Sequence, residues 1–127
     1  MEFTSIRIIT GDVARLVAFY EKATGGRATW ATEDFAQVRT ATATLAIGSL
    51  RTVGMLPADT VRPAENRGVI IEFQVADVDA LHAELRPVFE EFVLEPTTMP
   101  WGNRSMLLRD PDGNLVNFFT RPAAAGN

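Results

Sequence analysis

Arg7 and Glu72 are the residues whose types and positions best fit a chemical role. They carry opposite charges at equivalent positions of an internal repeat. A carboxylate can act as a general base and a guanidinium can polarise a carbonyl, so the pair could serve a metal-independent isomerase or lyase. The charge of Arg7 would, however, weaken Glu72 as a base. The two could instead form a structural ion pair, because burying either charge alone is costly.

Few other side chains offer catalytic or metal-binding groups. The chain has no cysteine and one histidine, His82. His82 lies on the side of a predicted helix that faces away from its apolar stripe, which predicts an exposed imidazole. No nucleophile–base arrangement or pair of carboxylates is visible in the sequence.

Composition limits which classes of protein this chain can belong to. The chain has 127 residues, of which 46% are hydrophobic and 22% are charged, as in one soluble globular domain. The net charge of −4 and the absence of a basic stripe argue against nucleic acid as a partner. No apolar run approaches the roughly 20 residues of a membrane span, and no secretory signal is present, so we expect a cytoplasmic protein without a membrane partner.

An internal repeat sets the architecture. The segment Ser5–Val13 matches the segment Ile70–Val78, and in each an apolar-rich strand runs into an aspartate followed by valine. Asp12 and Asp77 are suited to cap a following helix, since a carboxylate accepts hydrogen bonds from first-turn amides. Each half therefore predicts a strand, a helix and further strands.

The predicted helices end near Gly25 and before Pro87. Strands are expected at about 28–33, 36–40, 43–47 and 51–56 in the first half, and at 92–96, 103–109 and 115–120 in the second. The Pro- and Gly-containing stretch 57–68 reads as a linker. Module 1 then covers about 1–60 and module 2 about 68–122, and the residues after Arg121 are predicted to be a disordered tail.

Residues 110–119, Asp-Pro-Asp-Gly-Asn-Leu-Val-Asn-Phe-Phe, predict a turn that opens into a strand, with Gly113 supplying a positive φ. This stretch, Phe19-Tyr20-Glu21, Trp101-Gly102-Asn103-Arg104 and the duplication together resemble the vicinal oxygen chelate superfamily. That superfamily includes glyoxalase I, extradiol dioxygenases, fosfomycin resistance enzymes and bleomycin-binding proteins. The resemblance covers nearly the whole chain and implies a single α+β domain, 1–127, of two tandem βαβββ modules forming a cup-shaped sheet, the glyoxalase/bleomycin resistance fold.

The resemblance also identifies four positions that hold a metal in the enzymes of that superfamily. They correspond here to Ser5, Ile70, Gly54 and Asn117. None is a histidine or a carboxylate, and divalent cations need such donors. We therefore expect no metal and no cofactor.

The resemblance further implies that these positions face the cup, and strand alternation then gives its lining. The candidate ligand-binding residues from strands are Ser5, Arg7, Gly54, Leu56, Ile70, Glu72, Gln74, Asn117 and Phe119. Three further rings could stack on a planar ligand: Trp30, Phe35 and Trp101. The alternative for these rings is a place in the core or in a dimer interface.

The function that the resemblance favours is binding without catalysis. Bleomycin-binding proteins lack metal ligands, are acidic and form dimers, and this sequence shares the first two features. We expect a metal-free homodimer that sequesters an antibiotic or another aromatic or cationic natural product. The alternatives are the isomerase or lyase that uses Glu72 and Arg7, and a partner-binding module without a ligand.

Overall fold

The computed structural model describes residues 1–123, which divide into two compact units. The first unit comprises Met1–Asn66 together with Asp110–Gly113, and the second comprises Arg67–Arg109 and the chain from Asn114 onwards. The boundary after Asn66 lies in the predicted linker, which forms turns but no helix or strand. Of the tail predicted after Arg121, residues 124–127 lie outside the described part of the chain.

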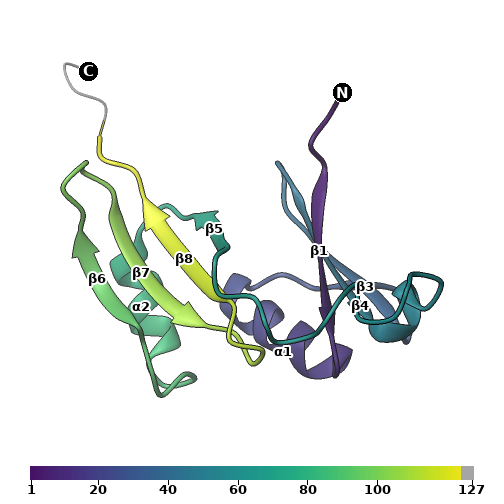
Figure 1. The fold of residues 1–127 in the computed structure, drawn as a ribbon. Helices are drawn as coiled ribbons and strands as arrows, with labels where there is room; N and C mark the ends of the chain where they lie inside the picture. The colour runs from purple at the N-terminus through teal and green to yellow at the C-terminus, as the bar shows by residue number, and fades with distance from the viewer. Residues whose placement is uncertain (124–127) are drawn as a thin grey trace. The chain divides into compact units, whose positions relative to one another are not determined.

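The first unit is a four-stranded sheet with one long helix (Figure 1). Its strands lie in the order β1-β4-β3-β2, with β1 parallel to β4 and the other pairs antiparallel. In chain order its elements are β1 (Ser5–Thr10), α1 (Val13–Thr24), β2 (Thr29–Thr32), β3 (Phe35–Arg39) and β4 (Thr44–Ser49).

Helix α1 begins and ends where the sequence predicts. The Asp12 side chain accepts a hydrogen bond from the Arg15 amide at 3.1 Å. Gly25 closes the helix at a φ of 73°, which a residue without Cβ adopts at little cost. The buried face of α1 packs on β3 and β4, and it includes Leu16 and Val17. Apolar burial of this kind supplies most of the stability of a short helix.

The second unit repeats this arrangement, with the strand order β5-β8-β7-β6 and α2 packed on β6, β7 and β8. The Asp77 carboxylate caps α2 by accepting from the Asp79 and Ala80 amides. Its elements are β5 (Ile70–Gln74), α2 (Val78–Leu85), β6 (Leu94–Thr98), β7 (Arg104–Arg109) and β8 (Leu115–Thr120). Each unit is therefore one βαβββ module, which confirms the predicted fold class.

The prediction of a strand at 51–56 is wrong. Residues Leu50–Val53 form a 3-10 helix, and the last strand of the first unit is β4. The Ser49 side chain accepts from the Arg51 amide at 3.1 Å, and the Thr52 hydroxyl donates to the Ser49 carbonyl at 2.7 Å. These local bonds compete with strand pairing, so a segment of good strand formers turns instead.

The prediction of an exposed His82 is also wrong. Its side chain is 15% exposed, and its ring meets Phe92 edge-on at a centroid distance of 4.9 Å. Its Nε2 lies 3.8 Å from a Glu95 carboxylate oxygen. The chain after Pro87 covers this side of α2, which the helical pattern by itself does not show.

A buried hydrogen bond ties the predicted turn to α1 within the first unit. The Tyr20 hydroxyl donates to the Asp110 carboxylate at 2.6 Å, and both residues are almost fully buried. Burial, and then the negative charge of Asp110, raise the pKa of Tyr20 well above its usual value. Asp110 also accepts from the Asp112 amide, and Gly113 adopts a φ of 84°, so the turn has the predicted form.

No helix among the described residues is long and apolar enough to cross a membrane.

Candidate functional site

Each sheet has one face covered by its own helix and one face that the helix leaves uncovered, here called the helix-free face. In the second unit, alternate residues buried on the helix side include Ile71, Val116 and Phe118. The helix-free face of that sheet carries five of the predicted site residues. They are Ile70, Glu72 and Gln74 on β5, and Asn117 and Phe119 on β8.

Glu72 and Asn117 form the polar centre of this face. They are paired in the register of β5 and β8, and the Asn117 amide nitrogen donates to Glu72 Oε2 at 2.9 Å. A carboxylate has only acceptors, so Glu72 fixes the orientation of the Asn117 amide with its nitrogen toward the carboxylate. Neighbours on this face are both apolar and polar. Ile70 is half exposed and Leu107 lies in the same cross-strand row, and the register also places Gln74, Ser105 and Arg109 on this face.

The other end of the Asn117 amide lacks a partner. Asn117 is 8% exposed, and its Oδ1 is buried without a hydrogen bond. An unsatisfied buried acceptor costs about 1–3 kcal/mol, so the fold retains this atom at a cost to stability. A buried acceptor of this kind calls for an explanation, such as a catalytic role or a bound water or ion.

The first unit brings three predicted site residues to its helix-free face. Arg7 pairs with Ala46, which pairs in turn with Gln37, and Ser5 and Phe35 lie on the same side by alternation. Trp30 does not join them. It pairs with the fully buried Ala36 and so lies on the face that α1 covers, where it is 43% exposed.

Gly54 and Leu56 lie outside the sheet, because the strand predicted for them does not exist. The alignment that made Gly54 the counterpart of Asn117 in the first module is therefore wrong. The register assigns that position to Ala46, since Arg7 pairs with Ala46 as Glu72 pairs with Asn117. A methyl group is no better a metal ligand than glycine.

The donor sets of the two units do not fit a divalent cation. The first unit offers the Ser5 hydroxyl and the Ala46 methyl group, and the second offers Ile70 and an Asn117 amide already bonded to Glu72. Within residues 1–123, no three His, Cys, Asp or Glu side chains are placed so that they could hold a metal ion. A metal-free site stays a prediction.

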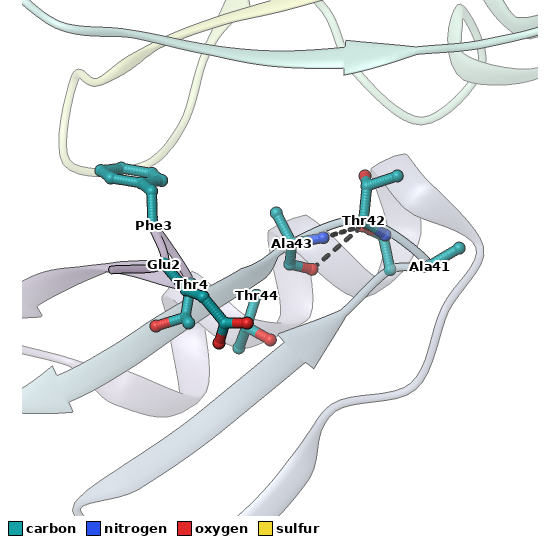
Figure 2. Close-up of a pocket in the computed structure, with 8 residues that line it drawn as sticks. Glu2, Phe3, Thr4, Ala41, Thr42, Ala43 and Thr44 are labelled. Atoms are coloured by element: carbon teal, nitrogen blue, oxygen red, sulfur yellow. Dashed lines mark hydrogen bonds between the residues drawn. The ribbon is translucent and has the colours of Figure 1, made fainter.

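An open hollow of about 560 Å³ lies beside the first sheet (Figure 2). Figure 2 shows residues 2–4, which precede β1, on one side of it and the turn 41–43 between β3 and β4 on the other. Most of its lining is polar, with hydroxyls from Thr4, Thr40, Thr42 and Thr44. No predicted site residue lines this hollow.

Two features of the site were missed by sequence reasoning. The Glu72–Asn117 bond follows from strand register, which the repeat could have given if β4 had been aligned with β8. Arg39 lies two residues after Gln37, on the same face as Arg7, and period-two alternation along 35–39 is the signal that could have revealed it.

The two units define a tandem βαβββ protein. Residues 2–118 match the model of the Glyoxalase/Bleomycin resistance protein/Dioxygenase superfamily. The chain belongs to this superfamily, as its sequence predicted.

Solved structures share the fold of this chain. A chain described as a conserved domain protein is 26% identical, with a TM-score of 0.75 over 95% of this chain and 99% of its own. A glyoxalase/bleomycin resistance protein/dioxygenase from Nocardioides is 22% identical, with a TM-score of 0.77 over 98% and 86%. A lactoylglutathione lyase from Agrobacterium tumefaciens is 18% identical, with a TM-score of 0.74 over 94% and 92%. The latter two likenesses show the fold alone. No curated protein matches the sequence.

Proposed function

We propose that this chain is a metal-free, cytoplasmic, homodimeric protein that binds and sequesters a small molecule, an antibiotic or another aromatic or cationic natural product. The observation that carries the proposal is the Glu72–Asn117 pair, whose neighbours on the same sheet face include the apolar Ile70, Leu107, Leu115 and Phe119 beside the polar Gln74 and Arg109. A few polar groups on an apolar surface are typical of ligand sites.

The chemistry of this pair favours a cationic ligand. Glu72 is exposed, and the Asn117 amide nitrogen donates a hydrogen bond to its carboxylate. The Asn117 oxygen is buried, so the acceptor open to a ligand is the Glu72 carboxylate, which suits a protonated amine or an amidine. Apolar neighbours such as Ile70 and Phe119 would contact the rest of the ligand.

The second candidate function is a metal-independent isomerase or lyase in which Glu72, in the second unit, acts as the base. The specific observation that favours it is that Asn117 orients the Glu72 carboxylate at 2.9 Å. A positioned base within hydrogen-bond reach of a substrate proton is what such chemistry requires. Turnover of a bound compound, lost in Glu72→Gln, would support this second function.

A thermal-shift panel tests the first function. It sets Ni²⁺, Co²⁺, Zn²⁺ and Mn²⁺ beside bleomycin-type glycopeptides and other cationic or aromatic antibiotics. A ligand at 100 times its Kd adds about 2.7 kcal/mol to the free energy of unfolding, so we expect a clear rise in Tm with an antibiotic. Glu72→Gln should remove that rise. A rise with a metal alone, or one bound metal per chain by elemental analysis, would overturn the metal-free proposal.

Replacing Trp101 should separate binding from folding. Trp101 lies in the β6–β7 loop and is 70% exposed, so Trp101→Ala should change the free energy of unfolding by less than about 0.5 kcal/mol. If its ring stacks on the ligand, the Kd of the compound that stabilises the protein should rise roughly tenfold. Trp30→Ala, on the helix-covered face of the other unit, is the matched control. A lower Tm with unchanged Kd would assign Trp101 to the fold.

A further inference from the structure

The sheet of the first unit carries an unusual set of charges. Its four strands contain two charged residues, Arg7 on β1 and Arg39 on β3, and no aspartate or glutamate. The sheet of the second unit contains both signs, with Glu72, Arg104 and Arg109 among them. The chain as a whole is acidic, with a formal net charge of −4. A purely positive sheet therefore stands out against the composition of the chain.

Strand register places both arginines on the helix-free face. Arg7 pairs with Ala46, and Ala46 pairs with Gln37, so the three form one row across the sheet. Arg39 follows Gln37 by two residues and therefore points to the same side. The residues that alternate with these along each strand, such as Val38 and Ile47, are buried on the side of α1.

The strand between the two arginines carries small side chains. On β4, Thr44 and Ala46 face the same side as Arg7 and Arg39. Two strand spacings separate the backbones of β1 and β3 by about 10 Å. The long stems of both arginines can lean over Thr44 and Ala46 from opposite sides, which leaves room between them for a group with several oxygens.

Within the first unit, neither arginine is neutralised by a carboxylate. Arg51 and Arg62 of this unit each lie within 4.0 Å of one, whereas Arg7 and Arg39 have none within that distance among the residues of this unit. Arg39 instead donates from Nη2 to the Gln37 side-chain oxygen at 2.7 Å. A neutral amide holds the guanidinium in place without cancelling its charge, and the other guanidinium N–H groups remain available as donors.

From these observations we propose that the helix-free face of the first sheet binds an oxyanion, a carboxylate or a phosphate group, between Arg7 and Arg39. Guanidinium groups bind such oxyanions through paired, charge-assisted hydrogen bonds. Thr44, between the two arginines, also lines the open hollow of Figure 2, so an uncharged part of the ligand can extend along its threonine hydroxyls, beside Glu2, which lines the hollow as well. This site lies within the first unit and does not use Glu72, so its failure would leave the proposed sequestering function standing.

The test uses the full chain and two simple probes, inorganic phosphate and acetate, added at constant ionic strength. Two-dimensional NMR should show saturable shifts of backbone amides on β1, β3 and β4. Arg7→Gln and Arg39→Gln should each weaken binding by roughly tenfold, because each removes a charge-assisted hydrogen bond to the anion. Tighter binding of phosphate than of acetate identifies a phosphate-bearing ligand, and the reverse order identifies a carboxylate.

Three controls make the result specific. Arg15→Gln removes an exposed arginine of α1 in the same unit, and it should leave the Kd unchanged. Glu72→Gln should leave the Kd unchanged as well. Melting temperatures of Arg7→Gln and Arg39→Gln should match the wild type, since both side chains are exposed. Shifts that do not saturate, or an equal loss in Arg15→Gln, would overturn the proposal, because either result would indicate unspecific attraction of anions to positive charge.

Discussion

Tyr20→Phe should lower the free energy of unfolding by about 2 kcal/mol, because it removes a buried hydrogen bond to a carboxylate and leaves the ring in place. The Tyr20 hydroxyl lies 2.6 Å from Asp110, and both residues are less than 5% exposed. Urea or guanidinium denaturation measures the change. A double-mutant cycle with Asp110→Ala should give a coupling energy above about 1 kcal/mol. Additive losses would show that the bond contributes nothing of its own.

The same bond makes stability sensitive to alkali. The folded pKa of Tyr20 is raised above the ordinary value of 10.0, so the unfolded chain gives up this proton first. The stability that depends on the protonated hydroxyl is complete below pH 10 and is lost as the pH rises beyond it. Tyr20 is the single tyrosine of the chain, so tyrosinate absorbance reports it directly. The absorbance should appear only with unfolding, and Tyr20→Phe should weaken the alkaline loss of stability.

Asn117→Asp should have the second large effect on the free energy of unfolding, and the size of the loss should depend on pH. The substitution keeps the shape of the side chain, removes its donor and places a second carboxylate against Glu72, where the two atoms now lie 2.9 Å apart. Near neutral pH we expect a loss of about 2 kcal/mol, comparable to a hydrogen bond to a charged group. Two adjacent carboxylates raise the folded pKa of one of them. The loss is therefore absent well below pH 4 and grows as the pH rises.

Asn117→Leu is the matched control, because it removes the donor without adding a charge. Its loss of stability should be nearly independent of pH between acid and neutral solution. Thermal unfolding of the three proteins across this range measures the difference. Equal stability of Asn117→Asp and the wild type at neutral pH would mean that the Glu72–Asn117 bond is not formed in solution.

Much of the fold could be predicted because local signals agree with it. Capping by Asp12 and Asp77 marks both helix starts, and the predicted strand 115–120 coincides with β8. The failure at 51–56 has a local cause: Ser49 and Thr52 satisfy backbone groups that a strand would pair with its neighbour. Pattern alone does not reveal such competition, because leucine, threonine and valine favour strands.

The candidate site could be predicted only in part, because its decisive contacts are non-local. Alternation along β5 gives the helix-free face correctly, with Glu72 on it. The bond from Asn117 to Glu72 spans the register of two strands that are distant in sequence. The position of Trp30 depends on its pairing with Ala36, which strand propensity does not fix. His82 is covered by a segment after its helix, which the helical periodicity cannot include.

The return of residues 110–113 to the first unit has a consequence for folding during synthesis. Tyr20 and Asp110 are separated by 90 positions along the chain, yet they meet inside one unit. The ribosome completes α1 long before Asp110 emerges. Until then the Tyr20 hydroxyl, which the folded protein buries, lacks the Asp110 carboxylate that accepts its hydrogen bond. Most modules fold as soon as they are made, from the N-terminus onwards. Here the N-terminal module becomes complete only after most of the second module has been made, and a chain halted at the linker would carry its tyrosine without the carboxylate that accepts its hydrogen bond.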